Sequence, residues 1–169
     1  MKIVIPEKVS TRGVEELKNE PGWKVVQLTP DSVKSGDLGR ELADADALIV
    51  RSAVKVTAAM MAAAPKLRVI GRAGIGVDNV DLDAATKQGI VVMNTPGGNA
   101  VSVAELTLGF MIALARELSR ADFTTRAGKW EKKSLEGAEL KGKTLGILGL
   151  GRIGLEVARR ARAFEMDLV

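Results

Sequence analysis

Residues 143–154 read KTLGILGLGRIG, and this run carries the most informative pattern in the chain. Its apolar residues Leu145–Leu148 predict a buried strand of a parallel sheet, and a helix is predicted over Leu155–Phe164. Between the two lies the pattern GxGxxG, formed by Gly149, Gly151 and Gly154. A glycine turn without a ligand stays open as an alternative. A strand before the pattern and a helix after it favour a dinucleotide-binding loop.

Each glycine has a physical role in such a loop. The first permits a tight turn, the second lets a pyrophosphate approach the backbone, and the third lets the helix pack close to the strand. The helix N-terminus adds unpaired N–H groups and partial positive charge. A ribose-binding acidic residue is expected about 20 residues later, but the next strand has only begun, at Asp167, when the sequence reaches Val169. We therefore expect the start of a Rossmann dinucleotide-binding domain, truncated before its end.

Composition narrows the class of protein. Of the 169 residues, 46% are hydrophobic and 27% are charged, which is typical of a globular chain. There is no cysteine and no histidine, so the commonest metal ligands and general bases are missing and no metal site is predicted. A net charge of +4 with 3% aromatic residues does not indicate nucleic-acid binding. The most apolar stretch, 100–115, is shorter than a membrane span, and the chain does not start with a signal peptide. We expect a soluble, cytoplasmic protein.

Short apolar runs alternate with helical patterns over residues 1–97. The runs predict five strands, at 2–5, 23–28, 47–50, 67–72 and 90–93. Helices are predicted at 11–18 with Thr11 as N-cap, at 38–45, from the cap Thr57 to near Pro65, and at 82–87 before Gly89. This alternation predicts a doubly wound parallel α/β sheet of the flavodoxin-like type.

Unusual residues follow three of these strands, at the sheet edge where open α/β proteins bind ligands. Arg51 and Ser52 follow one strand, as either a solvated loop or a ligand contact. Gly71–Asn79 contains paired glycines that predict either a plain turn or a concave turn whose N–H groups receive a carboxylate. Asn94–Asn99 contains a proline and two glycines and is expected to lead from one domain to the next, at a boundary after residue 97.

The longest helix is predicted over residues 100–119. Ser102 and Glu105 form a capping-box pattern, although a start at Asn99 is also open. Two apolar stripes run along it: the first is Val101, Ala104, Leu108, Met111, Ala115 and Leu118, and the second is Val103, Leu106, Phe110 and Leu114. A helix that is apolar on nearly every side is expected to be buried on nearly every side, either by a partner or neighbouring domain or within one subunit.

Residues 120–142 are polar and basic. We expect a solvated segment here, with Trp130 anchoring it by burial.

Several of these runs together resemble the D-isomer-specific 2-hydroxyacid dehydrogenases. The matching runs are RSAVKVT (51–57), GRAGIGVDNVD (71–81), VMNTP (92–96), GKW (128–130) and GKTLGILGLGRIG (142–154). The resemblance covers essentially the whole chain. It implies a flavodoxin-like substrate domain, residues 1–97, beside an NAD-binding Rossmann domain that begins with residues 98–169, with the active site in the cleft between them.

The implied reaction is hydride transfer from C2 of a 2-hydroxyacid to NAD. The runs are most similar to those of members that oxidise 3-phosphoglycerate in serine biosynthesis. By position, the implied substrate-binding residues are Arg51, Ser52, Gly74 and Asn99. The implied cofactor-binding residues are Ile75, Gly149, Gly151, Arg152, Ile153 and Gly154. The long helix is implied to form a homodimer or a tetramer.

The resemblance places no catalytic residue within this chain. Members of the family use an arginine and a histidine–glutamate pair that lie beyond the glycine loop, so the 169 residues alone are expected to be inactive. Two alternatives stay open. One is a related enzyme that acts on glyoxylate or hydroxypyruvate, and the other is a non-catalytic module that senses nucleotide and binds a partner.

Overall fold

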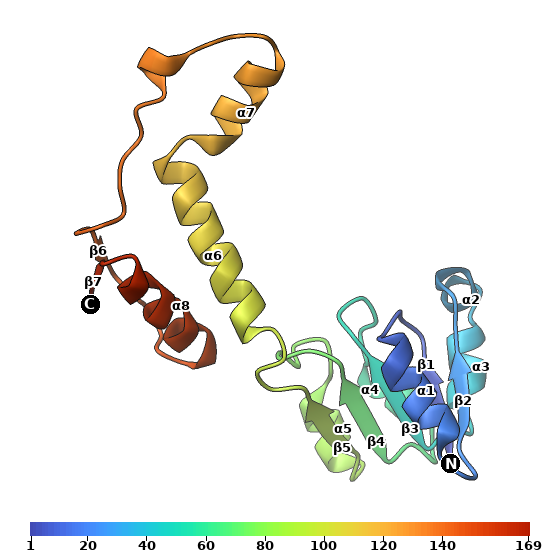
Figure 1. The fold of residues 1–169 in the computed structure, drawn as a ribbon. Coiled ribbons are helices and arrows are strands. Elements are labelled where there is room, and N and C mark those ends of the chain that lie inside the picture. The colour runs from blue at the N-terminus through green and yellow to red at the C-terminus, as the bar shows by residue number, and fades with distance from the viewer. The chain divides into compact units, whose positions relative to one another are not determined.

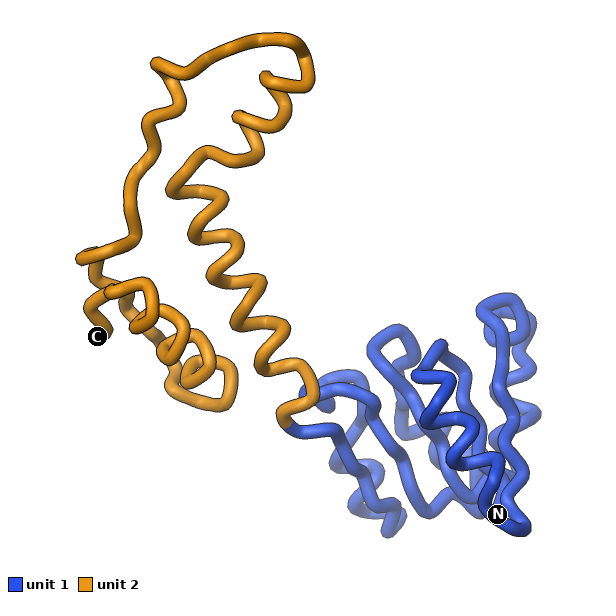
Figure 2. Tube along the Cα trace, viewed as in Figure 1, with its two compact units in different colours: residues 1–96 blue, residues 97–169 orange.

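The chain forms two compact units, Met1–Pro96 (unit 1) and Gly97–Val169 (unit 2), in a computed structural model that describes residues 1–169 (Figure 2). No helix in either unit combines the length and the apolar character needed to cross a membrane.

Unit 1 is built on a sheet of five parallel strands in the order β2-β1-β3-β4-β5 (Figure 1). The strands are β1 (Lys2–Ile5), β2 (Lys24–Gln27), β3 (Ala47–Val50), β4 (Val69–Arg72) and β5 (Val91–Asn94). The predicted five-stranded parallel sheet is confirmed, and its strand order is the flavodoxin-like one. Ile3, Ala47, Val69 and Val91 are paired across four neighbouring strands, so these strands start at the same level.

Helices lie on both faces of this sheet, which is why its central strand β3 is apolar throughout. The helices are α1 (Thr11–Asn19), α2 (Pro30–Lys34), α3 (Asp37–Leu42), α4 (Ala58–Ala62) and α5 (Leu82–Lys87). Successive side chains of a strand point to opposite faces. Ile3 and Ile5 therefore pack against Val14 of α1, while Val4 belongs to the larger core that includes residues of α3, α4 and α5.

Local capping explains where the helices of unit 1 differ from expectation. The predicted N-cap Thr11 is wrong, because Ser10 occupies that position and Thr11 is the first helical residue. Helix α2 was not predicted; it begins after Thr29, whose side chain accepts a hydrogen bond from the Ser32 amide. The cap at Thr57 is confirmed, since its hydroxyl accepts from the Met60 amide at 3.3 Å.

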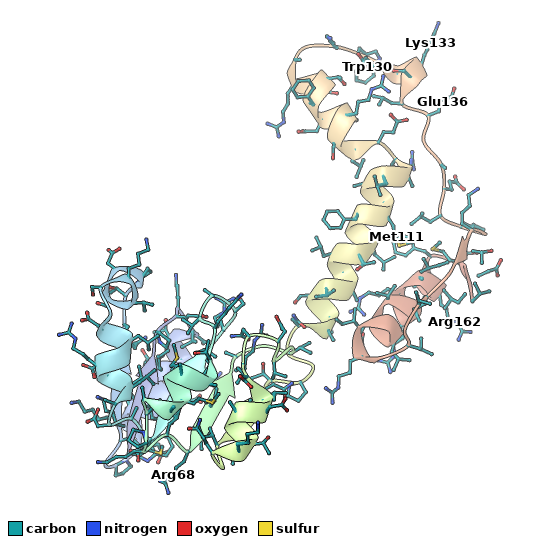
Figure 3. The ribbon with its side chains drawn as sticks, turned by 180° about the vertical axis from the view of Figure 1, so that it is seen from behind. Arg68, Met111, Trp130, Lys133, Glu136 and Arg162 are labelled. Carbon is teal, nitrogen blue, oxygen red and sulfur yellow. The ribbon has the colours of Figure 1, made fainter.

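Unit 2 packs a long helix against a shorter helix that flanks two paired strands. Its elements are α6 (Ala100–Ala115), α7 (Leu118–Arg126), the 3-10 turn η1 (Lys132–Ser134), β6 (Thr144–Leu145), α8 (Arg152–Ala163) and β7 (Asp167–Leu168). The strands β6 and β7 are parallel. Ala104 and Leu108 of α6 pack with Val157 of α8, and Met111 faces the same cluster (Figure 3).

An ion-pair cluster on α8 adds to this packing. Glu156 accepts hydrogen bonds from Arg160 and Arg159 at 2.6 Å each. The hydrogen bond from Arg160, with the charges of both arginines, holds the pKa of the Glu156 carboxyl below its usual range. Arg160 also lies 3.6 Å from the carboxylate of Glu105, so the cluster links α8 to α6.

The predicted strand Leu145–Leu148 is too long. Strand β6 ends at Leu145, although the Ile147 amide still donates to the Val169 carbonyl at 2.8 Å, and Leu148 is fully exposed. Helix α8 begins at Arg152, three residues before the predicted start, since Gly151 already takes the N-cap position.

The predicted helix 100–119 is two helices. Glu117 adopts a left-handed conformation with φ 50°, which ends α6 and allows α7 to start in a new direction. The capping box is also wrong, because Asn99 is the N-cap and Ser102 lies within the first turn. On the first stripe Ala104 and Leu108 are buried, but Val101 and Leu118 are exposed.

Three of the four residues of the second stripe of α6 are exposed, and Val103 is half-buried. Leu106, Phe110 and Leu114 are 57%, 59% and 81% exposed, respectively. This face is therefore an apolar surface of the single chain.

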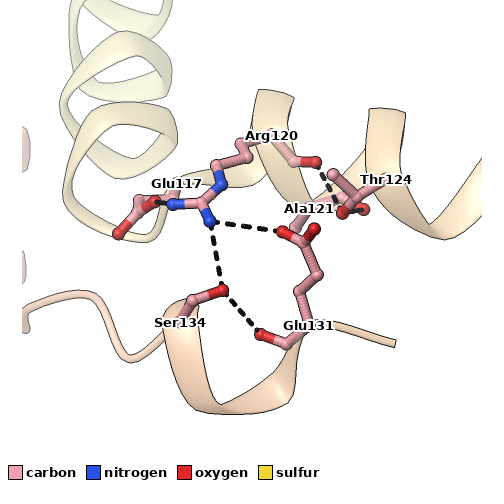
Figure 4. A network of polar contacts seen from close by, with 6 residues as sticks. All are labelled: Glu117, Arg120, Ala121, Thr124, Glu131 and Ser134. Carbon is pink, nitrogen blue, oxygen red and sulfur yellow. Dashed lines mark hydrogen bonds and ion pairs between the residues drawn. The ribbon is translucent and has the colours of Figure 1, made fainter. Parts of the chain in front are cut away.

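The segment after α7 is held by Arg120 and not by Trp130. The Arg120 guanidinium contacts the carboxylates of Glu117 and Glu131 and the hydroxyl of Ser134, each at 3.1–3.2 Å (Figure 4). Trp130 is 83% exposed, so the expectation that it anchors the segment by burial is wrong.

The close approach at Gly154 generates a prediction about stability. A Cβ at this position would lie 2.2 Å from the carbonyl oxygen of Gly149, so Gly154→Ala forces the backbone to shift. We expect a loss of about 1–3 kcal/mol of unfolding free energy, measured by denaturant unfolding. Gly109→Ala is the matched control, because Gly109 lies in α6 with no heavy atom near its Cβ position. It should stabilise the chain by about 0.5–1 kcal/mol through helix propensity. Equal effects of the two substitutions would contradict the packing argument.

Candidate functional site

The carboxyl ends of β1, β3 and β4 lie at one edge of unit 1, because these strands are parallel and in register. Glu7 and Lys8 come after β1, Arg51 and Ser52 after β3, and residues 73–76 after β4. Four of the predicted site residues thus fall on one sheet edge: Arg51, Ser52, Gly74 and Ile75. In open α/β sheets this is the edge that binds ligands.

A cavity of about 390 Å³ lies at this edge, lined by Lys8, Val9, Ser10, Arg51 and Ala73. Its lining contains two cationic side chains and one hydroxyl and no carboxylate. Such a lining suits an anionic group such as a carboxylate or a phosphate. Lys8 and Ser10 are not among the predicted site residues; their place just after an apolar strand is the signal that could have found them.

Arg72 brings a third cationic side chain to the same edge. It is the last residue of β4, and its Nε donates to the Arg51 carbonyl at 3.1 Å. Its guanidinium also lies over the backbone of Gly74, where an added Cβ would come within 1.7 Å of Nη1. A side chain at Gly74 would therefore displace Arg72.

The loop after β4 is fixed by its own hydrogen bonds. The Gly74 amide donates to the Arg72 carbonyl at 2.8 Å, and the Gly74 carbonyl accepts from the Thr95 amide at 2.9 Å. The Ile75 carbonyl accepts from the Asn94 side chain at 2.7 Å. The Gly74 amide is thus hydrogen-bonded within the loop. The bonds from Asn94 and Thr95 connect the loop after β4 to the end of β5.

The glycine loop of unit 2 has the geometry that its sequence suggests. Gly149 has φ +103°, a conformation open to glycine and strained for other residues. Gly151 is the N-cap of α8, and Gly154 sits against the Gly149 carbonyl with no room for a side chain.

The N-terminus of α8 is free of competing groups. Its first turn contains no acidic residue, and no side chain caps it. An added Cβ at Gly151 would meet no heavy atom within 4 Å, so the backbone here is open to an approaching group. Unpaired N–H groups and the helix dipole favour an anion at this place, and the residues fit the pyrophosphate of a dinucleotide.

The remaining predicted residues of unit 2 lie around this loop. The side chain of Ile153 packs into the cluster between α6 and α8, which leaves its backbone amide at the helix N-terminus. Arg152 Cδ lies 3.9 Å from the Cβ position of Gly97, so the starts of α6 and α8 are close. Asn99 is the N-cap of α6; its carbonyl accepts from the Val103 amide, and its side chain makes no capping hydrogen bond.

No group of three or more His, Cys, Asp or Glu side chains in the structure is placed to hold a metal ion.

Comparisons with known proteins agree with this arrangement. The profile of the D-isomer specific 2-hydroxyacid dehydrogenase family, catalytic domain, matches residues 3–165. D-3-phosphoglycerate dehydrogenase of Rattus norvegicus is 53% identical over 154 residues, which cover 91% of this chain and 28% of the rat protein. Hydroxypyruvate reductase of Thermotoga maritima is 49% identical over 144 residues, which cover 85% of this chain and 47% of that protein.

A solved structure agrees in fold. NAD⁺-bound 3-phosphoglycerate dehydrogenase of Entamoeba histolytica superposes with a TM-score of 0.76 at 35% identity, over 99% of this chain and 52% of that one. The chain therefore spans less than a third of the rat protein and about half of the Entamoeba chain.

A profile match over nearly the whole chain, together with the five-stranded parallel sheet, shows that this chain belongs to the D-isomer specific 2-hydroxyacid dehydrogenase family.

Proposed function

We propose that this chain is the N-terminal part of an enzyme that oxidises 3-phosphoglycerate at C2 to 3-phosphohydroxypyruvate, with NAD as hydride acceptor. The proposal is carried by the observation that unit 1 has a cation-lined strand edge and unit 2 has an uncapped glycine-loop helix. The 53% identity to rat D-3-phosphoglycerate dehydrogenase supports the choice of substrate.

In this proposal the two units bind different ligands. Residues 1–97 form the substrate-binding domain, and residues 98–169 form the first part of an NAD-binding Rossmann domain. Strand β6, the glycine loop, α8 and β7 make up the opening strand–turn–helix–strand of such a domain, with the two strands parallel.

The glycine loop holds the cofactor. The backbone at Gly149, Gly151 and Gly154 and the amides of Arg152 and Ile153 surround the pyrophosphate, and Ile75 contacts the nicotinamide. Bound NAD supplies the hydride acceptor. The NAD⁺-bound relative from Entamoeba histolytica supports NAD as the cofactor.

The substrate lies at the edge of unit 1. 3-Phosphoglycerate carries a carboxylate and a phosphate, and the side chains of Lys8, Arg51 and Arg72 provide positive charge for such a ligand. Ser52, Gly74 and Asn99 complete the substrate contacts.

A second candidate is reduction of hydroxypyruvate or glyoxylate by the same chemistry. It is favoured by the 49% identity to the Thermotoga maritima hydroxypyruvate reductase. A third candidate is a non-catalytic module that senses nucleotide. Such a module would bind NAD without turning over a substrate.

The exposed apolar face of α6, formed by Leu106, Phe110 and Leu114, supports a further part of the proposal. We assign this face to contact between subunits in a homodimer or tetramer, because burying it removes apolar surface from water.

Gly151→Ala tests the cofactor site. Because Gly151 has a negative φ of −80° and open space around its Cβ position, the substitution leaves the fold unstrained. The added methyl group lies where the pyrophosphate must approach, so we expect at least about a 10-fold loss of NAD affinity by calorimetry, equal to about 1.4 kcal/mol. Gly13→Ala, in α1 and equally unobstructed, should leave binding unchanged. Equal NAD affinity of Gly151→Ala and the wild-type chain would refute the assignment of the pyrophosphate to this loop.

Arg51→Ala tests the anion site. Loss of a charge-assisted hydrogen bond costs about 1.5–3 kcal/mol, so the Kd for 3-phosphoglycerate should rise about 10- to 100-fold. Arg68→Ala is the matched control, because Arg68 is an exposed arginine just before β4, at the opposite edge of the sheet (Figure 3). Titrating hydroxypyruvate and glyoxylate alongside separates the candidates. Tighter binding of the unphosphorylated acids would favour the second function.

The 169-residue chain should not turn over 3-phosphoglycerate. Oxidation at C2 requires a group that removes the hydroxyl proton, and the histidine–glutamate pair that the family resemblance assigns to this step is not among these residues. NADH formation followed by absorbance with the purified chain should equal the rate of a protein-free blank. Steady formation of NADH would refute the assignment of proton transfer to residues outside this chain.

A further inference from the structure

The loop Arg51–Val54 has no regular structure, yet its backbone is held at both ends. It follows β3 at the sheet edge and presents Arg51 to the cavity lined by Lys8 and Ala73. Two side chains from distant parts of the chain, Glu7 and Asn79, bind the same two loop residues.

Glu7 binds the amides of the loop. Its Oε2 accepts from the Arg51 amide at 2.6 Å, and its Oε1 accepts from the Val54 amide at 2.5 Å. One carboxylate thus fixes both ends of the four-residue loop. A carboxylate that accepts two backbone N–H groups makes charge-assisted hydrogen bonds, which are stronger than neutral ones.

Asn79 binds the carbonyls of the same two residues. Its Nδ2 donates to the Arg51 carbonyl at 2.9 Å and to the Val54 carbonyl at 2.8 Å. The residue is only 8% exposed, and its Oδ1 is buried without a partner. The side chain is therefore placed for its two donor hydrogens, at the cost of an unsatisfied acceptor.

Glu7 is an unexpected residue for an anion-binding edge. Through charge alone, a carboxylate beside Lys8 and Arg51 weakens the attraction for an anionic ligand. Its presence is explained if both of its oxygens are needed to hold the loop in the conformation that directs Arg51 to the ligand.

We propose that Glu7 and Asn79 are positioning residues that hold Arg51 in its ligand-binding conformation. This inference rests on the proposed function, in which Arg51 binds the anionic substrate. A loop released from one side visits the binding conformation for only part of the time, and the apparent Kd rises by the inverse of that fraction.

The test uses Glu7→Gln, which removes the negative charge and one of the two acceptors. Positioning and charge predict opposite signs: a positioning role weakens binding of 3-phosphoglycerate, whereas a purely electrostatic role strengthens it. We expect the Kd measured by calorimetry to rise about 10-fold, as for a loop that is competent one-tenth of the time. Glu16→Gln, an exposed glutamate of α1 that pairs only with Arg12, is the matched control and should leave the Kd unchanged.

Two further measurements separate positioning from general stability. Hydrogen exchange of the Arg51 and Val54 amides should accelerate in Glu7→Gln, while the amides of β1 and β3 keep their protection. In an Arg51→Ala background, Glu7→Gln should weaken binding no further, since it acts through Arg51. Asn79→Ala should reproduce the loss of affinity; if it fails to fold, the Glu7 variants still decide the matter.

The outcomes distinguish this inference from the proposed function. If the wild-type chain does not bind 3-phosphoglycerate, the proposed function fails and the inference falls with it. If the wild type binds and Glu7→Gln binds equally well or more tightly, the positioning role alone is overturned. An equal further loss in the Arg51→Ala background also overturns it, because Glu7 would then act independently of Arg51.

Discussion

The register of the parallel strands β1, β3 and β4 is the constraint on which the candidate anion site depends. Ile3, Ala47 and Val69 are paired directly across these strands, and each strand is four residues long. The chain therefore leaves the sheet at the same level each time. Groups that are 44 and 21 residues apart in sequence consequently meet at hydrogen-bond distance around Arg51. A shift in the pairing of one strand would separate Arg51 from its partners.

The glycine loop of unit 2 depends on a different constraint, the absence of side chains. Gly149 turns the chain with a positive φ, and Gly154 allows α8 to lie against the carbonyl of Gly149. The same packing places Ile153 in the apolar cluster with Leu108, which orients the first turn of the helix. Gly151, which lies between these two glycines, has open space around its Cβ position.

Local patterns were sufficient to predict the sheet of unit 1. The runs at 2–5 and 47–50 are apolar because both faces of the central strands are buried, and they match β1 and β3 residue for residue. Helix α5 and the Thr57 cap could be predicted in the same way. The capping side chains accept hydrogen bonds from amides within one helical turn, and Gly89, which ends the helix, lies within one turn of its last residue. The glycine pattern fixed the place of the α8 N-terminus to within a few residues for the same reason.

Other features could not be predicted because they depend on distant or compensating contacts. The break at Glu117 needs a left-handed residue where the sequence continues in helical periodicity. The segment after α7 is held by Arg120 and its partners, so Trp130 is not required in a core. At the candidate site, the role of Glu7 is invisible in sequence, since its partners lie 44 and 47 residues away. Residue type and strand-end position revealed Arg51, but not the groups that orient it.

The two candidate anion sites of this chain differ in the physical origin of their attraction. At the edge of unit 1 the positive charges belong to long side chains such as Lys8 and Arg51, whose field is screened over about 10 Å at 0.1 M salt. At the start of α8 the attraction comes from backbone amides and the helix dipole, which do not titrate and act only within the first turn. Side chains on a loop hold an anion well only if their own conformation is fixed, whereas backbone amides are fixed by the helix itself. This difference explains why distant side chains form supporting hydrogen bonds around Arg51. The glycine loop needs only close packing to keep its backbone amides in place.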